Sequence, residues 1–257
     1  MTRVARPGTG PTMSRRRLRL RDMPMILMYH SVASVGADPN SLCVTPGRFA
    51  EQMAWLDRNG LRGVSVGTLL ARMRAGRARG LVGITFDDGY QAIMETALPE
   101  LRSRGFSATV FVISGLIGGT NRWDEGPSWP LVTADQVGVL AAAGFEIGSH
   151  SVSHPRLAGL PADRLRAEIA GSRADLCALS GTDVRGFAYP YGSMDAAARA
   201  AVRDAGFDYA CAVQTSWGDL GLWSLPRVYI GQRDTAGRLA GKRLLNRGRI
   251  ALRGARS

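Results

Sequence analysis

The sequence has few residues of the types that build disulfide frameworks, cysteine zinc sites or membrane spans. Its 257 residues include three cysteines, Cys43, Cys177 and Cys211, which are odd in number and form no CxxC pair. This pattern argues against a disulfide framework or a cysteine zinc site and predicts reduced, buried thiols. No apolar run reaches the roughly 18 residues that a transmembrane helix needs. Histidine is also scarce, with three in the chain.

Acidic residues are outnumbered by basic ones, and the excess of positive charge lies at the two ends of the chain. The formal net charge is +12. Residues 1–22 hold seven arginines and one aspartate, and residues 233–257 hold eight Lys/Arg and one aspartate. The sequence between them is nearly neutral and contains no reading helix or zinc-finger spacing, which argues against nucleic-acid binding. We expect residues 1–22 to form a disordered basic arm.

Residues 23–232 are predicted to form one α/β domain. Short apolar runs, from 25–29 to 223–230, alternate with segments of helical periodicity and are predicted to be strands. Helices are predicted at 91–104 and at about 161–180 among other places, and 31–45 is predicted to be an irregular loop. Alternation of this kind predicts a mostly parallel sheet, either open or closed into a barrel. A chain of this length can fold as a single barrel.

Two adjacent carboxylates, Asp87 and Asp88, follow the apolar run 82–86 and precede Gly89. Adjacent residues of a strand point to opposite faces, so both can share one site only where the strand ends and the backbone turns. Glycine permits such a turn. Carboxylates this close repel, which favours a cation that holds one ionised while the other exchanges a proton. The alternative is a structural turn in which both aspartates cap the next helix.

Two histidines four residues apart, His150 and His154, follow another predicted strand. With an aspartate from a different strand end, they make a two-histidine, one-carboxylate set that suits Zn²⁺ or another first-row divalent ion. In the alternative, both histidines only hydrogen-bond the loop. His30 and the turn at Tyr191 also come just after predicted strands, at the edge where parallel α/β folds build their sites.

Three motifs resemble those of metal-dependent polysaccharide deacetylases, the family-four carbohydrate esterases with a NodB-homology domain. They are Thr-Phe-Asp-Asp-Gly at 85–89, His-Ser-x-x-His at 150–154 and Tyr-Pro-Tyr-Gly at 189–192. The resemblance covers roughly residues 25–230. It implies a distorted (β/α) barrel of about seven repeats with a mostly parallel sheet. It also implies hydrolysis of N-acetyl, or less often O-acetyl, groups on sugars.

The same resemblance implies roles for single residues. Asp88, His150 and His154 would bind a divalent metal, with Zn²⁺ as the first expectation and Co²⁺ or Ni²⁺ as alternatives. Asp87 would be the general base, and the backbone N–H of Tyr191 would help to hold the oxyanion.

Two departures from the family pattern concern the base and the acid. The arginine that orients the base in many members is missing from the third motif, where Ala188 or Tyr189 stands. The late Leu-x-His motif resembles residues 225–227 here, without a histidine. The stretch 28–32 resembles the subgroup that acts on poly-N-acetylglucosamine, and a circularly permuted order would return His30 to the vacated place as general acid. Otherwise, His30 is a loop residue that bonds a backbone carbonyl.

Weaker candidates for substrate binding are Trp123, Asp124, Tyr189 and Arg227. Trp123 and Asp124 lie in a long predicted loop and could form a sugar-stacking wall or orient Asp87. Tyr189 and Tyr191 could also stack on a pyranose ring, or these aromatic residues could cover the rim structurally. The guanidinium of Arg227 could pair with Asp87 or Asp124, or Arg227 could simply end the last strand.

The expected function is metal-dependent removal of N-acetyl groups from an N-acetylhexosamine-containing poly- or oligosaccharide or glycoconjugate. An ionised base and a protonated acid would give a bell-shaped pH–rate profile. A peptidoglycan or a lipid-linked sugar is an alternative substrate. An alternative of another class is an inert barrel that binds a membrane or a polyanion.

The basic tail at 233–257 interleaves leucine and isoleucine with arginine and lysine. It could be solvated, or it could form an amphipathic helix that contacts an anionic membrane surface. Because no clear leader is visible, we expect a cytoplasmic location, with the tails either solvated or in peripheral contact with a membrane. The sequence leaves the oligomeric state open.

Overall fold

The computed structural model describes residues 25–213 and 221–254, with side chains described as far as residue 246. The basic arm predicted at 1–22 lies outside the described residues.

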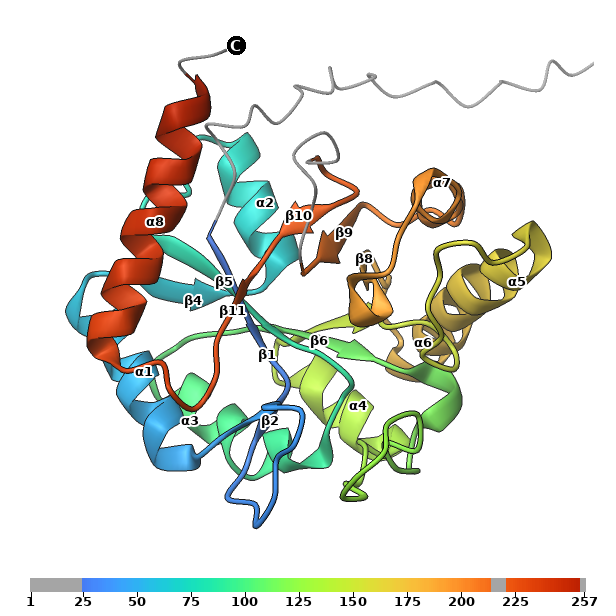
Figure 1. Cartoon of the computed structure of the whole chain (residues 1–257), viewed down its shortest axis with the longest axis horizontal. Helices are drawn as coiled ribbons and strands as arrows, with labels where there is room; N and C mark the ends of the chain where they lie inside the picture. The colour runs from blue at the N-terminus through green and yellow to red at the C-terminus, as the bar shows by residue number, and fades with distance from the viewer. Residues whose placement is uncertain (1–24, 214–220, 255–257) are drawn as a thin grey trace, which may run out of the picture.

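Parallel strands form a nearly closed barrel with helices around it (Figure 1). The order of the main sheet is β10-β9-β8-β7-β6-β5-β1-β11, and β4 pairs with β5. Every strand pair in this sheet is parallel. The predicted fold, a distorted barrel with a mostly parallel sheet, is therefore confirmed. The strands of the sheet are β1 (Ile26–Tyr29), β4 (Arg62–Val64), β5 (Leu81–Phe86), β6 (Thr109–Val112), β7 (Glu146–Ser149), β8 (Gly186–Ala188), β9 (Tyr209–Ala212), β10 (Leu225–Pro226) and β11 (Val228–Tyr229).

The barrel closes through one short segment near the end of the chain. Strands β10 and β11 stand at opposite ends of the sheet order, yet only Arg227 separates them in sequence. Leu225 pairs with Cys211 of β9, and Val228 pairs with Leu27 of β1. The single strand predicted at 223–230 is thus two strands that join the two edges of the sheet.

Helices cover the outside of the barrel, and local signals in the sequence explain where several begin. Thr45 caps α1 by accepting a hydrogen bond from the backbone N–H of Arg48, and a proline follows the cap. Thr133 and Gln136 form a reciprocal capping box at the start of α4. The helices are α1 (Pro46–Arg58), α2 (Val66–Arg74), α3 (Ala97–Ser103), α4 (Ala134–Ala142), α5 (Ala162–Arg166), α6 (Ser172–Ser180), α7 (Ala196–Asp204) and α8 (Ala236–Gly254).

The structure departs from the predicted elements in three further places. The helix predicted at 91–104 is a 3₁₀ turn, Gln91–Met94, followed by α3. A π-helical turn, Ala167–Gly171, divides the helix predicted at about 161–180. The stretch 31–45, predicted as an irregular loop, contains two short paired strands, β2 (Ser31–Val32) and β3 (Cys43–Val44).

The strands are buried as their apolar sequences predict. All four residues of β1 and all four of β6 are buried, as expected of strands in a sheet covered on both faces. Among the described residues, no helix is both long enough and apolar enough to cross a bilayer.

Gly148 in β7 tests how tightly the barrel interior is packed. A Cβ at this position would lie 2.4 Å from Cδ1 of Phe111, whereas a Cβ at Gly138 in α4 would have no neighbour within 4 Å. We expect Gly148→Ala to lower the free energy of unfolding by about 1–3 kcal/mol because it overpacks the interior. Gly138→Ala should raise it by about 0.4–1 kcal/mol. Urea denaturation measures both, and equal effects would contradict this account of the packing.

Candidate active site

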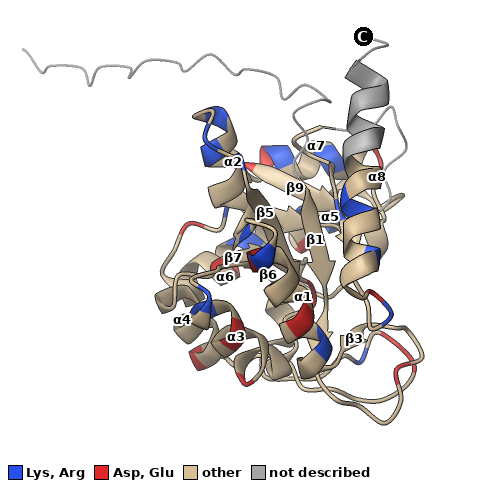
Figure 2. Cartoon of the chain, turned by 90° about the vertical axis from the view of Figure 1, so that its left-hand side faces the viewer, with Lys and Arg blue, Asp and Glu red and all other residues tan. Residues whose placement is uncertain are grey.

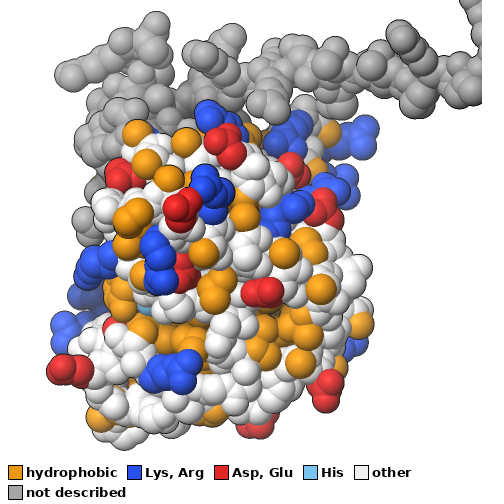
Figure 3. Space-filling view, turned by 90° about the vertical axis from the view of Figure 1, so that its right-hand side faces the viewer, with side chains coloured by type: hydrophobic (Ala, Val, Ile, Leu, Met, Phe, Trp, Pro, Cys, Tyr) orange, Lys and Arg blue, Asp and Glu red, His pale blue; other side chains and the backbone are white. Residues whose placement is uncertain are grey.

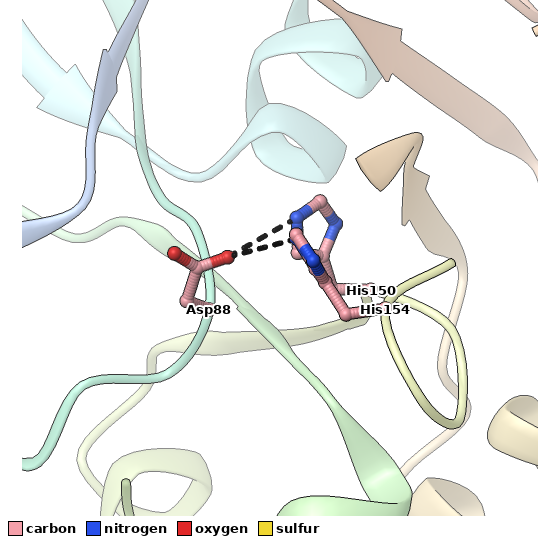
Figure 4. Close-up of side chains that lie close together, drawn as sticks. All are labelled: Asp88, His150 and His154. Carbon is pink, nitrogen blue, oxygen red and sulfur yellow. Dashed lines mark ion pairs between the residues drawn. The ribbon is translucent and has the colours of Figure 1, made fainter. Parts of the chain in front are cut away.

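Asp88, His150 and His154 converge at the carboxyl ends of the strands (Figure 4). Nε2 of His150 lies 3.3 Å from Oδ1 of Asp88, and Nε2 of His154 lies 3.4 Å from the same oxygen. All three side chains are buried, and one possible ligand atom from each lies within 4.8 Å of the others. Two segments far apart in sequence thus bring three potential metal ligands together.

The backbone at this site is in the left-handed region at several residues that are not glycine. The φ angles are 68° at Asp88, 68° at Ser151, 61° at His154 and 56° at Tyr191. Each such residue costs about 1–3 kcal/mol and persists only where the surrounding structure holds it, and such residues cluster at functional sites. One restraint is the hydrogen bond that the N–H of His154 donates to Oγ of Ser151 at 2.9 Å. The three side chains therefore project from sharply turned backbone at the ends of strands.

The donor set fits a divalent cation. A backbone carbonyl can only accept, so Nδ1 of His150 donates its proton to the carbonyl oxygen of Ala188 at 2.8 Å. In the neutral imidazole this leaves Nε2 as an acceptor that faces the Asp88 carboxylate, which also only accepts. A cation bound between these two acceptors would interact favourably with both. Histidines that bind metals usually donate their other ring N–H to a carbonyl or carboxylate, as His150 does here. Burial alone would raise the pKa of Asp88, but the adjoining imidazoles of His150 and His154 and the charge of His30 hold it well below its usual value.

Asp87, the neighbour of Asp88, forms a buried two-pronged ion pair with Arg227. Nη1 and Nη2 of Arg227 lie 2.5 Å and 2.7 Å from the two carboxylate oxygens. Burial would raise the pKa of Asp87, but the charge and hydrogen bonds of Arg227, together with the charges of His150 and His30, lower it below its usual value. An arginine from the closing segment of the barrel thus orients this carboxylate, although the third motif supplies none.

Three further contacts fix the Arg227 side chain. Its Nε donates to the carbonyl oxygen of Ala212 at 3.3 Å, and Nη1 donates to Oγ1 of Thr85 at 3.2 Å. The guanidinium carbon lies 5.5 Å from the ring centre of Phe111. Because the side chain is fully buried, Arg227 acts on the site through Asp87 and offers no surface to a sugar.

His30 follows β1 directly, next to the strand that carries the aspartates. Tyr29 is in register with Phe86, so His30 and Asp87 leave neighbouring strand ends. The charge of His30 contributes to lowering the pKa values of Asp87 and Asp88, after burial and the larger partners named above. Nδ1 of His30 is buried and has no hydrogen-bond partner within the described residues. The third histidine therefore lies near the same two carboxylates.

Aromatic side chains border the two histidines that converge on Asp88. The ring centre of Trp123 is 4.7 Å from that of His154, and the ring centre of Tyr191 is 4.6 Å from it. The hydroxyl of Tyr191 donates to Asp124 at 3.3 Å, and this tyrosine is 41% exposed. Figure 3 shows a histidine side chain among hydrophobic ones on one face of the molecule. Tyr189, in contrast, is fully buried and donates its hydroxyl to the carbonyl oxygen of Trp223.

Sequence reasoning did not single out Glu168, which lies in the π-helical turn. Its carboxylate accepts hydrogen bonds from the backbone N–H groups of Val152 and Ser153 at 3.0 Å and 2.9 Å, and from Oγ of Ser153 at 2.6 Å. These residues lie between His150 and His154. Nothing in the helical periodicity of the sequence distinguishes this glutamate from an exposed one.

Comparison with known protein families identifies the chain. Residues 75–210, more than half of it, match the family model described as polysaccharide deacetylase. The chain belongs to the polysaccharide deacetylase family. The family predicted from the three motifs is therefore confirmed, while the circularly permuted motif order stays a prediction.

Three proteins illustrate the similarity of this polysaccharide deacetylase to its relatives. YxkH of Bacillus subtilis (strain 168), named as a candidate polysaccharide deacetylase, is 30% identical over 211 residues, which are 80% of this chain and 70% of YxkH. The poly-β-1,6-N-acetyl-D-glucosamine N-deacetylase of Escherichia coli (strain K12) is 33% identical over 79 residues, which are 30% of this chain but only 12% of that enzyme. The fold matches that of the Streptococcus pyogenes deacetylase PplD, solved in complex with acetate, with a TM-score of 0.73 and 23% identity, over 85% of this chain and 97% of PplD.

The ion pair between Arg227 and Asp87 gives a double-variant test. Arg227→Met should lower the free energy of unfolding by about 3–5 kcal/mol, because it leaves a buried carboxylate unpaired. It should also raise the pKa of Asp87 and move the acidic limb of the pH–rate profile to higher pH.

Asp87→Asn combined with Arg227→Met should be more stable than Arg227→Met alone, since no buried charge is then left without its partner. Urea denaturation of the four proteins measures the coupling. Additive effects of the two substitutions would contradict the pairing.

Proposed function

We propose that this polysaccharide deacetylase is a divalent-metal-dependent hydrolase that removes N-acetyl groups from an N-acetylhexosamine-containing poly- or oligosaccharide or glycoconjugate. One observation carries the proposal. The buried set of Asp88, His150 and His154 lies beside Asp87, whose separate carboxylate Arg227 holds ionised. One carboxylate is thus available to a metal and the other to a proton.

Asp88, His150 and His154 would hold the divalent ion, with Zn²⁺ the first expectation from two imidazoles and one carboxylate. When bound there, the ion would polarise the acetyl carbonyl and lower the pKa of a nearby water. A set with three protein ligands leaves positions open for water and substrate, as catalytic sites require.

Of the remaining site residues, two transfer protons and one stabilises the oxyanion. Asp87 accepts a proton from the attacking water, and Arg227 holds its carboxylate in place for this. The N–H of Tyr191, presented by a backbone at φ 56°, donates to the oxyanion that forms from the acetyl carbonyl. His30 gives a proton to the departing amine, because an amide nitrogen leaves poorly without one.

Two features support a sugar substrate. Trp123 and the half-exposed Tyr191 flank His154, and aromatic faces of this kind can pack on a pyranose ring. The 79-residue match to the E. coli enzyme that acts on poly-β-1,6-N-acetyl-D-glucosamine makes that polymer the first substrate to test. Peptidoglycan fragments and lipid-linked N-acetylhexosamines complete the panel. Release of free amine and acetate identifies the substrate, and no release from any of them with metal bound would contradict the proposal.

Asp87→Asn tests whether Asp87 acts as the general base or as a metal ligand. We expect turnover to fall by roughly 100- to 10,000-fold, the usual contribution of a general base, while the bound metal stays near one ion per chain. Amine release and metal analysis on the same sample measure both quantities. Loss of the metal from this variant would mean that Asp87 is itself a ligand.

His30→Ala tests the proposed acid. The kcat value should fall by roughly 100-fold or more, with metal content unchanged, and the basic limb of the pH–rate profile should disappear. An acetyl ester with a good leaving group needs little protonation, so His30→Ala should hydrolyse it at nearly the normal rate. A near-normal kcat on the amide would make His30 structural.

A further inference from the structure

Helix α8 is fixed to the barrel along one side. Leu239 is fully buried in the core. Nζ of Lys242 lies 2.7 Å from the Asp234 carboxylate and donates to the carbonyl oxygen of Tyr229 at 2.6 Å. These contacts hold the first half of the helix against the segment that follows β11.

Away from these contacts, α8 exposes apolar side chains. Leu244 is 72% exposed and Leu245 is 63% exposed, and no other large hydrophobic side chain in the described part exceeds Val139 at 51%. A surface helix normally turns its apolar residues toward the core and its polar residues outward. The two neighbouring leucines thus form an exposed apolar pair that is accessible to a partner outside the barrel.

The charge of α8 identifies the chemistry of that partner. The helix segment 236–254 contains six lysine or arginine residues and no aspartate or glutamate. Figure 2 shows basic positions along the helix at the edge of the molecule. Apolar side chains that alternate with basic ones along a helix suit a bilayer surface whose lipids carry negative headgroups.

We propose that α8 docks this deacetylase on an anionic phospholipid surface, with Leu244 and Leu245 entering the headgroup region. The helix starts beside the strand ends that carry the active site and runs back along the barrel, so its last turns extend past the rest of the fold (Figure 1). Docking through these turns leaves the catalytic end of the barrel open to a sugar substrate. This proposal does not depend on which sugar is deacetylated.

Vesicle flotation of the full chain tests the docking surface. The chain should float with phosphatidylcholine vesicles that contain 30 mol% phosphatidylglycerol, chosen as a probe, and not with pure phosphatidylcholine. Leu244→Ser/Leu245→Ser should weaken partitioning by at least about tenfold, since two leucines no longer leave water. Arg247→Gln/Arg249→Gln/Arg253→Gln should weaken it by roughly 100-fold, at about a factor of five per charge.

Matched control variants distinguish binding through α8 from non-specific binding to vesicles. Val139→Ser removes an exposed apolar side chain from α4, and Arg72→Gln/Arg74→Gln removes charges from α2; both should float normally. Equal flotation with neutral vesicles, or no loss in the Leu244/Leu245 variant, would overturn the proposal. A concentration-dependent dimer that the same leucine variant abolishes would overturn it too, because a second copy would then cover the patch.

A second inference concerns Glu168 and rests on the metal site of the proposed function. Glu168 is 4% exposed, and it accepts three hydrogen bonds from Val152 and Ser153, which lie between the histidine ligands. The π-helical turn Ala167–Gly171 places it there, and such turns are frequent at functional sites. Arg164 lies 3.7 Å from the same carboxylate but is mostly exposed, so the loop supplies its main partners.

We infer that Glu168 is a positioning residue that holds the His150–His154 loop in its strained shape and so sets metal affinity. Without its carboxylate, two neighbouring backbone N–H groups lose their acceptor. The left-handed backbone at Ser151 and His154 then loses one of the restraints that keep it turned. The two imidazoles would spend less time in the converged arrangement.

Zinc affinity, measured by competition with a chromophoric chelator, tests Glu168 without an activity readout. Glu168→Ala should weaken zinc binding by about 10- to 100-fold, the usual effect of losing such a partner, and Glu168→Gln should restore part of it. Glu146→Ala is the matched control, because that carboxylate also accepts three hydrogen bonds, from Gly67, Thr109 and Tyr209, but at the start of β7. It should lower stability and leave zinc affinity within about threefold.

The outcomes distinguish this inference from the proposed function. Tight zinc binding by both the parent chain and Glu168→Ala would overturn the role of Glu168 and leave the metal site intact. Equal weakening by Glu146→Ala would also overturn it, since the effect would then follow from general destabilisation. No zinc binding by the parent chain would overturn the metal site itself.

Discussion

The buried ion pair between Arg227 and Asp87 connects the closure of the barrel to the chemistry of the site. Arg227 is the one residue between β10 and β11, which pair with opposite edges of the sheet. Its side chain reaches inward and binds both oxygens of Asp87. Removing two charges from water is unfavourable, and a pair is tolerated when its geometry is good and its remaining hydrogen bonds are made. The contacts to Thr85 and Ala212 meet that condition.

The backbone around the rest of the site is strained at several residues near the strand ends. Asp88, Ser151, His154 and Tyr191 all adopt left-handed backbone conformations, and each contributes or adjoins a group assigned to the chemistry. Hydrogen bonds from more distant elements hold these turns, such as the carbonyl of Ala188 that accepts from His150. The stability of the barrel thus offsets the cost of these strained turns, which bring together three side chains that could not converge from a regular helix or strand.

Local sequence patterns explain why much of the fold and of the candidate site was predictable. Buried apolar runs and capping residues are local signals, so the alternating strands and helices and the converging motifs could be read directly. The pairing of Arg227 with Asp87 joins residues 140 positions apart, so the sequence left it open among alternatives. The π-helical turn at Glu168 and the break at Arg227 leave the hydrophobic pattern almost unchanged, which is why both were predicted as uninterrupted elements.

A crystal structure of the chain grown with Zn²⁺, with anomalous diffraction at the zinc edge, tests the central claim most directly. The account predicts one strong anomalous peak, bound by Asp88, His150 and His154, with both oxygens of Asp87 still paired to Arg227. A peak at another place, or a zinc ion bound by Asp87 with Arg227 displaced, would contradict the division of the two aspartates into ligand and base.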